Sequence, residues 1–180
     1  MIQTISKEYK EQCVLMHQSE PTWGNLTAKP MALKSNLEDL LALWDSNKQG
    51  TILDYGCGKG WLAANFVQPV HEYDPGIPGK DSPPEPADLV VCLDVLEHIE
   101  PEYLTAVLDD LQRVIKKRGF FTVACNPAIA ILPDGRNAHL IVENSDWWLK
   151  KLLERFHIEF VNSANKKMVV IVKKLNDGSY

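Results

Sequence analysis

Hydrophobic positions along the chain follow two kinds of spacing. Short apolar runs, which are typical of strands buried on both faces, occur at residues 51–54 and 88–93. Between and after them, apolar residues three and four positions apart indicate amphipathic helices. Strands that alternate with helices predict an α/β fold, in which a mostly parallel sheet is covered by helices on both faces and ligands bind beyond the carboxyl ends of the strands.

The expected elements follow one another without an internal repeat. In order they are a helix from Pro30 to Gly50, a strand over 51–54, a helix over 61–66, strands over 70–73 and 88–93, a helix from Pro101 to Gly119, a strand over 120–124, a helix capped by Ser145 that runs to Phe156, and strands over 158–161 and 168–172. The last two strands are expected to pair as an antiparallel hairpin around residues 162–167. We expect one domain, with residues 1–49 as an N-terminal helical segment or lid and residues 50–175 as its core.

A glycine-rich stretch, Gly56-Cys57-Gly58-Lys59-Gly60, lies between the first strand and the next helix. Glycines at such a turn let a ligand approach the backbone closely. The spacing is GxGxG, whereas the fingerprint of dinucleotide-binding dehydrogenases is GxGxxG with an acidic residue about 20 positions on. A dehydrogenase is therefore disfavoured.

Aspartates stand at or next to the ends of three predicted strands, at Asp54, Asp74 and Asp94. The Asp74 carboxylate can accept hydrogen bonds from both hydroxyls of a ribose, although an aspartate before Pro75 and a glycine is also typical of a turn. Asp54 and Asp94 can face a cationic ligand, because a carboxylate offsets positive charge. The alternative for both is capping of the following helix.

Three ordered motifs resemble those of class I S-adenosylmethionine-dependent methyltransferases: residues 53–60, Tyr73-Asp74-Pro75 and residues 88–99. The likeness continues through His139-Leu140 to the helix over 148–156, which is similar to ubiquinone-biosynthesis-type and small phage-type members. The resemblance implies a three-layer, Rossmann-like α/β sheet. It also implies S-adenosylmethionine as cofactor, S-adenosylhomocysteine as product, and methyl transfer to an oxygen or nitrogen of a small molecule.

The resemblance also implies a set of cofactor-binding residues. Asp54 and the glycines would hold the methionine portion, Asp74 the ribose, and Asp94 would lie near the amino group or sulfonium. The full set is Asp54, Tyr55, Gly56, Cys57, Gly58, Gly60, Asp74, Pro75, Leu93 and Asp94, with Trp23 from the lid.

One departure from the family concerns residues 75–87, which separate Asp74 from the next strand and hold five prolines. Family members usually have a helix and a further strand here. This edge of the sheet is therefore expected to be truncated after the second strand. The adenine-side contacts are expected to come from residues such as Ile77, Asp81 or Ser82.

Two histidines are candidates for a general base towards an oxygen or nitrogen acceptor, His139 first and His98 second. Asp94, Glu97 and His98 also have i, i+3, i+4 spacing, so with His139 they could bind a divalent cation. This set resembles that of metal-assisted 2′-O and catechol-type methyltransferases. The metal is not favoured, because many metal-free class I enzymes carry the same Glu-His pair.

Composition narrows the choice of partners. The net charge of −5 disfavours a broad nucleic-acid surface, although an RNA or nucleotide methyltransferase, metal-assisted or not, stays an alternative. A second alternative is a non-catalytic cofactor-binding module or activator subunit. Four dispersed cysteines without a CxxC pair, and no run of 18 apolar residues, favour a cytoplasmic protein without a membrane segment. We expect a monomer or a homodimer.

Overall fold

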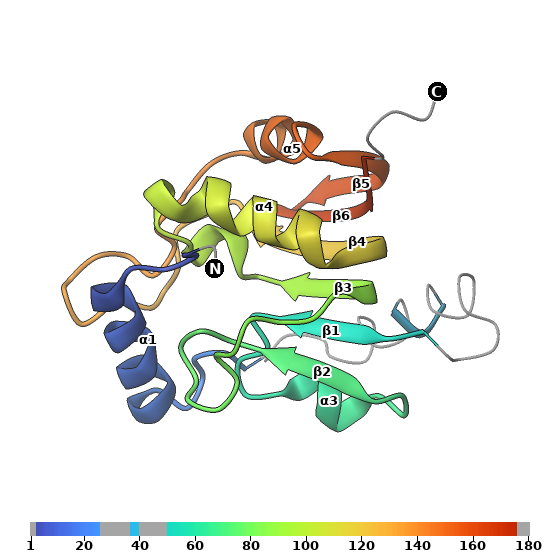
Figure 1. The fold of residues 1–180 in the computed structure, drawn as a ribbon. Helices are drawn as coiled ribbons and strands as arrows, with labels where there is room; N and C mark the ends of the chain where they lie inside the picture. The colour runs from blue at the N-terminus through green and yellow to red at the C-terminus, as the bar shows by residue number, and fades with distance from the viewer. Residues whose placement is uncertain (1–2, 26–36, 40–49, 176–180) are drawn as a thin grey trace.

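The fold is that of a computed structural model, which describes residues 3–25, 37–39 and 50–175 (Figure 1). The helix predicted from Pro30 to Gly50 lies outside the described residues apart from 37–39, which are helical. Among the helices of the described part, none has the length and apolar character needed to cross a bilayer.

The centre of the fold is a six-stranded sheet in the order β2-β1-β3-β4-β6-β5. Its strands are β1 (Ile52–Tyr55), β2 (Val70–Tyr73), β3 (Ala87–Leu93), β4 (Ile115–Ala124), β5 (Phe156–Ala164) and β6 (Lys167–Lys174). The pairs among β2, β1, β3 and β4 are parallel, whereas β6 is antiparallel to β4 and to β5. The expected α/β fold, mostly parallel and closed by an antiparallel hairpin, is confirmed.

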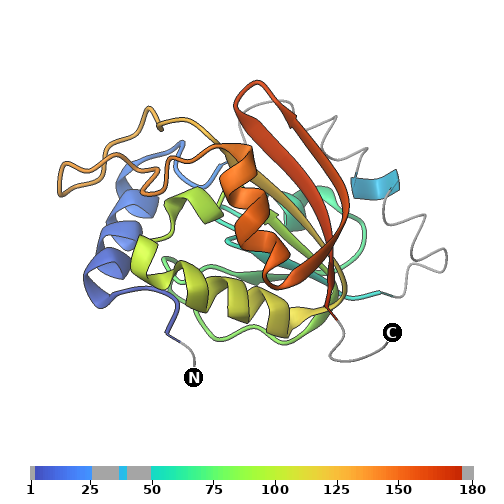
Figure 2. The ribbon, with the colours of Figure 1, turned by 90° about the horizontal axis from the view of Figure 1, so that it is seen from above.

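Helices pack against both faces of this sheet and beyond one of its ends. The named helices are α1 (Lys7–Ser19), α3 (Trp61–Asn65), α4 (Leu104–Val114) and α5 (Ser145–Leu153), with two 3-10 turns, η1 (Leu96–His98) and η2 (Pro101–Tyr103). Figures 1 and 2 show α4 and α5 together on one face, and α1 beyond the end of the sheet towards which β1, β2 and β3 point.

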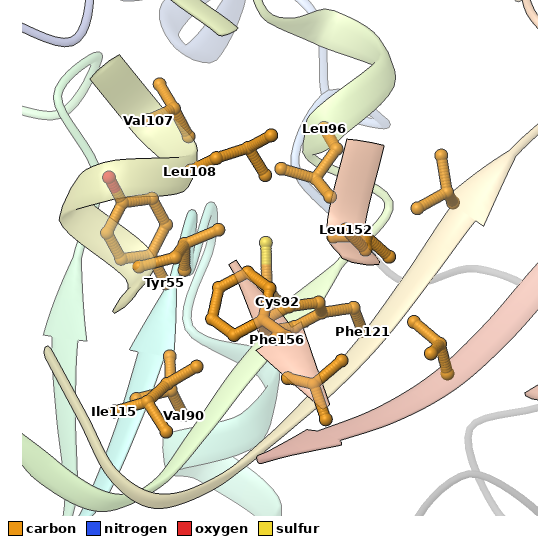
Figure 3. Packing of buried hydrophobic residues seen from close by; sticks show 14 of the residues in the cluster. Tyr55, Val90, Cys92, Leu96, Val107, Leu108, Ile115, Phe121, Leu152 and Phe156 are labelled. Carbon is orange, nitrogen blue, oxygen red and sulfur yellow. The ribbon is translucent and has the colours of Figure 1, made fainter. Parts of the chain in front are cut away.

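The core divides into two main clusters because successive strand residues point to opposite faces. Leu53, Val90 and Phe121 face α4 and α5, where Trp148 is fully buried. Figure 3 shows the aromatic centre of this cluster, in which the rings of Phe121 and Phe156 meet edge to face at 5.9 Å. The alternate strand residues pack on the opposite face against Leu62 of α3. Each face of the sheet is thus covered, as the apolar runs predicted.

The sheet ends at β2, and residues 74–86 form neither helix nor strand. The backbone of this loop closes on itself, with the amide of Asp74 donating to the carbonyl of Lys80 over 2.9 Å. Lys10 of α1 forms an ion pair of 2.8 Å with Asp81. The truncation predicted for residues 75–87 is confirmed, and α1 packs against the shortened loop.

Two helix boundaries differ from the prediction. The helix predicted to end at Gly119 ends at Val114, because Ile115 already pairs with Ala87 in the sheet. Likewise α5 ends at Leu153, and Phe156 is the first residue of β5. These apolar residues are buried in either conformation, so their spacing could not locate the change from helix to strand.

Residue types at two other positions were misread or missed. Asn144, not Ser145, caps α5, since its side chain accepts a hydrogen bond of 2.9 Å from the amide of Trp147. The bounds of helix α1 were not predicted within the expected helical segment 1–49, although Ser6 caps it by accepting from the amide of Tyr9. Its narrow apolar stripe, formed by Tyr9, Cys13 and Met16, is the signal that could have revealed it.

Candidate functional site

A cavity of about 690 Å³ lies at the carboxyl ends of β1, β2 and β3. Four segments line it: α1, residues 20–25, the glycine loop, and residues 126–131 after β4. Strand ends and single residues such as His98 and His139 complete the lining. Its position is the one expected for a ligand site in an open α/β sheet, and its size falls within the usual range of ligand pockets.

The glycine loop forms one wall of this cavity. Gly56, Gly58 and Gly60 have φ values of 80°, 50° and 77°, which residues with a side chain rarely adopt. The amides of Gly56 and Cys57 both donate to the carbonyl of Tyr73, over 2.7 and 3.0 Å. The loop is therefore fixed against the end of β2.

Asp74 connects this loop to the turn that follows β2. Its Oδ2 accepts from the amide of Gly58 over 3.0 Å, and its Oδ1 accepts from the amide of Gly76 over 2.9 Å. The turn role considered from the sequence is thus present. Each carboxylate oxygen can accept a second hydrogen bond, so the side chain keeps acceptor capacity towards the cavity that it lines.

Asp54 is the most deeply buried of the three strand-end aspartates, with 4% of its surface exposed. Burial, followed by the nearby charges of Glu72 and Asp74, raises the pKa of its carboxyl to about 7. The register of β1 and β2 places Asp54 opposite Glu72. A cationic group entering the cavity would stabilise the ionised form of this carboxyl.

Asp94 also lines the cavity, but its charge is already paired. Lys167 of β6 lies 2.7 Å from its Oδ2, and the hydroxyl of Thr122 donates to its Oδ1 over 2.7 Å. The backbone of Asp94 has a φ of 53°. Lys167 therefore already offsets part of the charge that Asp94 can present to a cationic ligand, and the position of Asp94 near the amino group or sulfonium stays a prediction.

Three aromatic rings connect the lid segment to the later loop. Trp23 and His98 meet edge to face at 5.1 Å, and His98 and His139 do so at 4.8 Å. Nδ1 of His98 lies 2.8 Å from the carbonyl oxygen of Ala138, and Nδ1 of His139 contacts the carbonyl oxygen of Asn126. A carbonyl can only accept, so both Nδ1 atoms carry hydrogen, and Nε2 is the nitrogen that has the lone pair in the neutral form of each ring.

Burial, followed by the neighbouring His139, lowers the pKa of His98 to about 4. The His98 imidazole is therefore neutral at neutral pH. A neutral ring with its Nε2 lone pair unprotonated can take a proton from a bound acceptor or bind a metal.

Glu97 lies beside the two histidines and is fully buried. Its Oε1 accepts from the amide of Ala124 over 2.8 Å, whereas its Oε2 has no hydrogen-bond partner among the described residues. Burial and then the Asp94 charge raise the pKa of Glu97 to about 8. One ligand atom each from Glu97, His98 and His139 lie within 4.8 Å of one another. Asp94 is not part of this cluster, so the structure reduces the predicted four-residue metal set to three.

Most of the predicted cofactor and catalytic residues do line one cavity. They are Trp23, Asp54, Gly56, Cys57, Gly58, Asp74, Pro75, Leu93, Asp94, His98 and His139.

Tyr55 and Gly60 do not line the cavity. Tyr55 packs under α4, where its hydroxyl donates to Asp110 over 3.0 Å, and Gly60 caps α3. None of Ile77, Asp81 and Ser82, the expected adenine-side residues, lines it either. The wall on this side comes from α1 instead, because the shortened loop leaves room for it.

The α1 residues on this wall are Tyr9, Cys13, Met16 and His17. His17 has its Nε2 3.7 Å from Oδ2 of Asp74, and its buried Nδ1 has no partner among the described residues. Sequence reasoning named none of these four residues, because it expected a helical segment over residues 1–49 without locating α1 within it.

Known proteins were compared with the chain by sequence and by structure. A family model described as a methyltransferase domain matches residues 28–164. No curated protein sequence matches the chain significantly.

Solved structures with the same fold include three methyltransferases. The 1,6-didemethyltoxoflavin-N1-methyltransferase of Burkholderia thailandensis, with bound 1,6-didemethyltoxoflavin and S-adenosylhomocysteine, has a TM-score of 0.61 at 16% identity, over 98% of this chain and 94% of that chain. Magnesium protoporphyrin IX methyltransferase of Synechocystis PCC 6803, with bound S-adenosylhomocysteine, has a TM-score of 0.53 at 17% identity, over 79% and 84%. The 16S rRNA methylase RmtB has a TM-score of 0.51 at 17% identity, over 96% and 77%. At these identities the likeness shows a shared fold.

Proposed function

The chain belongs to the methyltransferase domain family, and we propose that it transfers a methyl group from S-adenosylmethionine to an oxygen or nitrogen of a small-molecule acceptor. The observation that carries this proposal is the joining of the glycine loop, Asp54 and Asp74 around one cavity at the carboxyl ends of the strands. Solved structures of the same fold hold S-adenosylhomocysteine, which supports the choice of cofactor.

The residues present fit this cofactor. Asp54 offers a buried carboxylate to the ammonium group, and the glycine loop leaves backbone free of side chains beside it. Asp74 keeps acceptor capacity for the ribose hydroxyls, since each of its oxygens accepts one hydrogen bond from the backbone. On the same side, His17 adds a ring nitrogen that has no hydrogen-bond partner among the residues described.

Methyl transfer asks little covalent chemistry of the protein. When bound, S-adenosylmethionine supplies an electrophilic methyl group on a sulfonium. The chain's own part is to hold an acceptor in line and to keep water out. Trp23 from the lid side and residues 126–131 from the far side narrow the cavity. Nε2 of His139 or His98 can take the proton of a hydroxyl or amine acceptor.

Calorimetric titration of S-adenosylhomocysteine into the purified protein tests the cofactor assignment. Saturable binding is expected, and Asp74→Ala should weaken it at least about tenfold. Asp81→Ala is the matched control, because Asp81 lies in the same loop without lining the cavity. Equal affinity of the Asp74→Ala and Asp81→Ala variants, or no binding by folded protein, would remove the assignment.

A second candidate is a metal-assisted form of the same reaction, favoured by the cluster of Glu97, His98 and His139. Histidines that ligate metals usually donate their other ring N–H to a backbone carbonyl or carboxylate, as both histidines do here. Glu97 contributes an oxygen without a hydrogen-bond partner in the described structure. Two imidazoles and one carboxylate suit Zn²⁺, Mn²⁺ or Fe²⁺.

Direct metal titration of protein that has been stripped of metal with a chelator distinguishes the metal-assisted form from a metal-free one. Stoichiometric Zn²⁺ or Mn²⁺ binding that Glu97→Gln and His139→Asn each abolish is expected if the cluster is a metal site. Full methyl transfer by metal-stripped protein would leave the histidines as bases only. Cofactor binding without any turnover would instead favour a non-catalytic module or an activator subunit.

A further inference from the structure

The electrostatics of the cavity carry an inference about the acceptor, which rests on the proposed function. Four of the described residues that line the cavity bear carboxylates. No lysine or arginine is among the described lining residues. The acidic residues are Glu20, Asp54, Asp74 and Asp94, of which Asp94 is paired with Lys167. A ligand that carried a phosphate or carboxylate at the reacting end would meet negative charge without a cationic partner there.

Cationic side chains around the cavity are held by other groups. Nζ of Lys59 donates to the carbonyls of Glu20 and Pro21, over 3.0 and 2.8 Å. Lys80 is paired with Glu72 at 3.0 Å, and Lys167 with Asp94 at 2.7 Å. None of these three side chains can turn to an anionic acceptor without breaking the contact that it makes.

Arg136, on the loop after β4, is likewise engaged. Its guanidinium forms an ion pair of 2.7 Å with Asp134 and lies 5.8 Å from the centre of the Tyr9 ring. The side of the cavity that faces the lid and the later loop is therefore neutral to negative.

The same side of the cavity is apolar. Ile129 is fully exposed and Ile131 is 55% exposed, and both line the cavity together with Pro127 and Trp23. Large apolar side chains exposed together beside a site are typical of a surface that a ligand covers. A planar ring could pack between Trp23 and the two isoleucines, and the two histidine Nε2 atoms would then accept from its hydroxyl or amine.

We infer that the methyl acceptor is an uncharged or cationic molecule with a largely apolar, planar body and a phenolic or amine nucleophile, and that phosphate-bearing or carboxylate-bearing acceptors are disfavoured at this cavity. Charge complementarity selects the acceptor, and Ile129 and Ile131 cover its apolar body. The cavity thereby favours a small molecule over a nucleic acid.

Charged thiol reagents measure the electrostatic preference of the cavity directly, without knowledge of the acceptor. Ile129→Cys places a reactive thiol at the rim of the cavity, and Val67→Cys places one at a site that is 97% exposed and does not line it. Each variant is treated with a cationic and with an anionic methanethiosulfonate. The rate at which the native cysteines react with each reagent is measured on wild-type protein and subtracted. Both positions are exposed, so neither substitution disturbs the core.

The ratio of cationic to anionic rate is expected to be about tenfold higher at residue 129 than at residue 67 in low salt, and to converge on the ratio at residue 67 in 0.5 M NaCl. A ratio at residue 129 equal to or below that at residue 67, or one that salt leaves unchanged, would overturn the inference. Tight binding of a fluorescein-labelled RNA hairpin at physiological salt, weakened by Ile129→Asp, would overturn it as well.

Titration of S-adenosylhomocysteine into the same two variants separates this inference from the proposed function. If the proposed function is wrong, S-adenosylhomocysteine does not bind, whereas the ratio of cationic to anionic reaction rates can still be measured. If only the inference about the acceptor is wrong, S-adenosylhomocysteine binds, but the rate ratio at residue 129 is equal to or below that at residue 67, or does not change with salt.

Discussion

The backbone amide of Lys59 donates a hydrogen bond of 2.9 Å to the carbonyl oxygen of Gly24, which ties the segment after α1 to the glycine loop. The side chain of Lys59 reinforces this contact by donating to the carbonyls of Glu20 and Pro21. Residues 20–25 and the glycine loop therefore form one wall of the cavity, and a change in either should be felt in cofactor binding.

Gly58→Ala tests this wall. Gly58 has a φ of 50°, and a β-carbon there would overlap with the backbone of Gly24. We expect a loss of about 1–3 kcal/mol in the free energy of unfolding and a weaker affinity for S-adenosylhomocysteine. Gly79→Ala is the matched control, because Gly79 has a φ of 89° but a β-carbon there would meet nothing within 4 Å. Urea denaturation and calorimetry measure both effects, and equal results for the two variants would contradict the packing argument.

Asp54 should make cofactor affinity depend on pH. Its pKa in the folded protein is raised to about 7, so below that pH the ammonium of S-adenosylhomocysteine must displace a proton to meet the carboxylate. Affinity is expected to fall up to about tenfold per pH unit below 7 and to level off above it. Calorimetry in buffers of different ionisation enthalpy would show proton release near pH 6. Constant affinity from pH 5 to 8 would exclude Asp54 from the ammonium site.

The same carboxyl affects stability with a defined sign. Because the pKa of Asp54 is higher in the folded state than in the unfolded chain, the folded state binds the proton more tightly and stability falls as pH rises from about 4 to 7. Asp54→Asn removes this charge. The variant should gain at most about 4 kcal/mol over wild type at pH 8 and little at pH 4, while losing cofactor affinity. Urea denaturation at the two pH values checks it, and an equal effect at both would contradict the shift.

The two histidines can be told apart by asparagine substitution. Asparagine keeps an N–H near the position of Nδ1, so the hydrogen bonds to Ala138 and Asn126 can persist while the Nε2 lone pair is lost. Replacement of the residue that acts as base should lower kcat by about 10²–10⁴, with unchanged S-adenosylhomocysteine affinity. If His98 is that base, kcat should stay flat above pH 5, since its pKa is about 4. Near wild-type kcat in both variants would remove the base role.

Lys166→Gly should stabilise the hairpin of β5 and β6. Asn165 and Lys166 form its turn with φ values of 53° and 60°, a combination for which asparagine followed by glycine is preferred. A gain of roughly 0.5–1 kcal/mol is expected from thermal or urea unfolding. Asn165→Gly is the comparison, with a smaller gain because asparagine already tolerates this conformation. Destabilisation by Lys166→Gly would show that its side chain makes contacts that outweigh the strain.

The predictable part of the site lies in residues adjacent in sequence to buried strands. Gly56, Gly58, Asp54 and Asp74 could be found because they lie within or directly after the short strands β1 and β2, whose positions in the sequence could be predicted. The truncated edge was predictable as well, since residues 75–87 are too short and too rich in proline for a helix and a strand.

What could not be predicted depends on contacts distant in sequence. Lys167 meets Asp94 only because β6 lies next to β4, so the pairing of charges is a consequence of strand order. Helix α1 reaches the cavity through its contacts with Gly76 and Asp81, which its own mostly polar sequence does not reveal. The helix ends near Ile115 and Phe156 were missed because both residues continue the helical spacing of buried apolar positions, Ile115 four residues after Leu111 and Phe156 four residues after Leu152.

The stripe of Tyr9, Cys13 and Met16 on α1 packs against Leu132 and Ala138, more than a hundred residues later in the chain. A growing polypeptide would therefore display this stripe to solvent until the segment after β4 has been synthesised. Closing so long a loop is slow compared with local helix formation. Helix α1 is thus synthesised first but packs late, and a nascent chain lacks a finished binding site until four of the six strands have been synthesised.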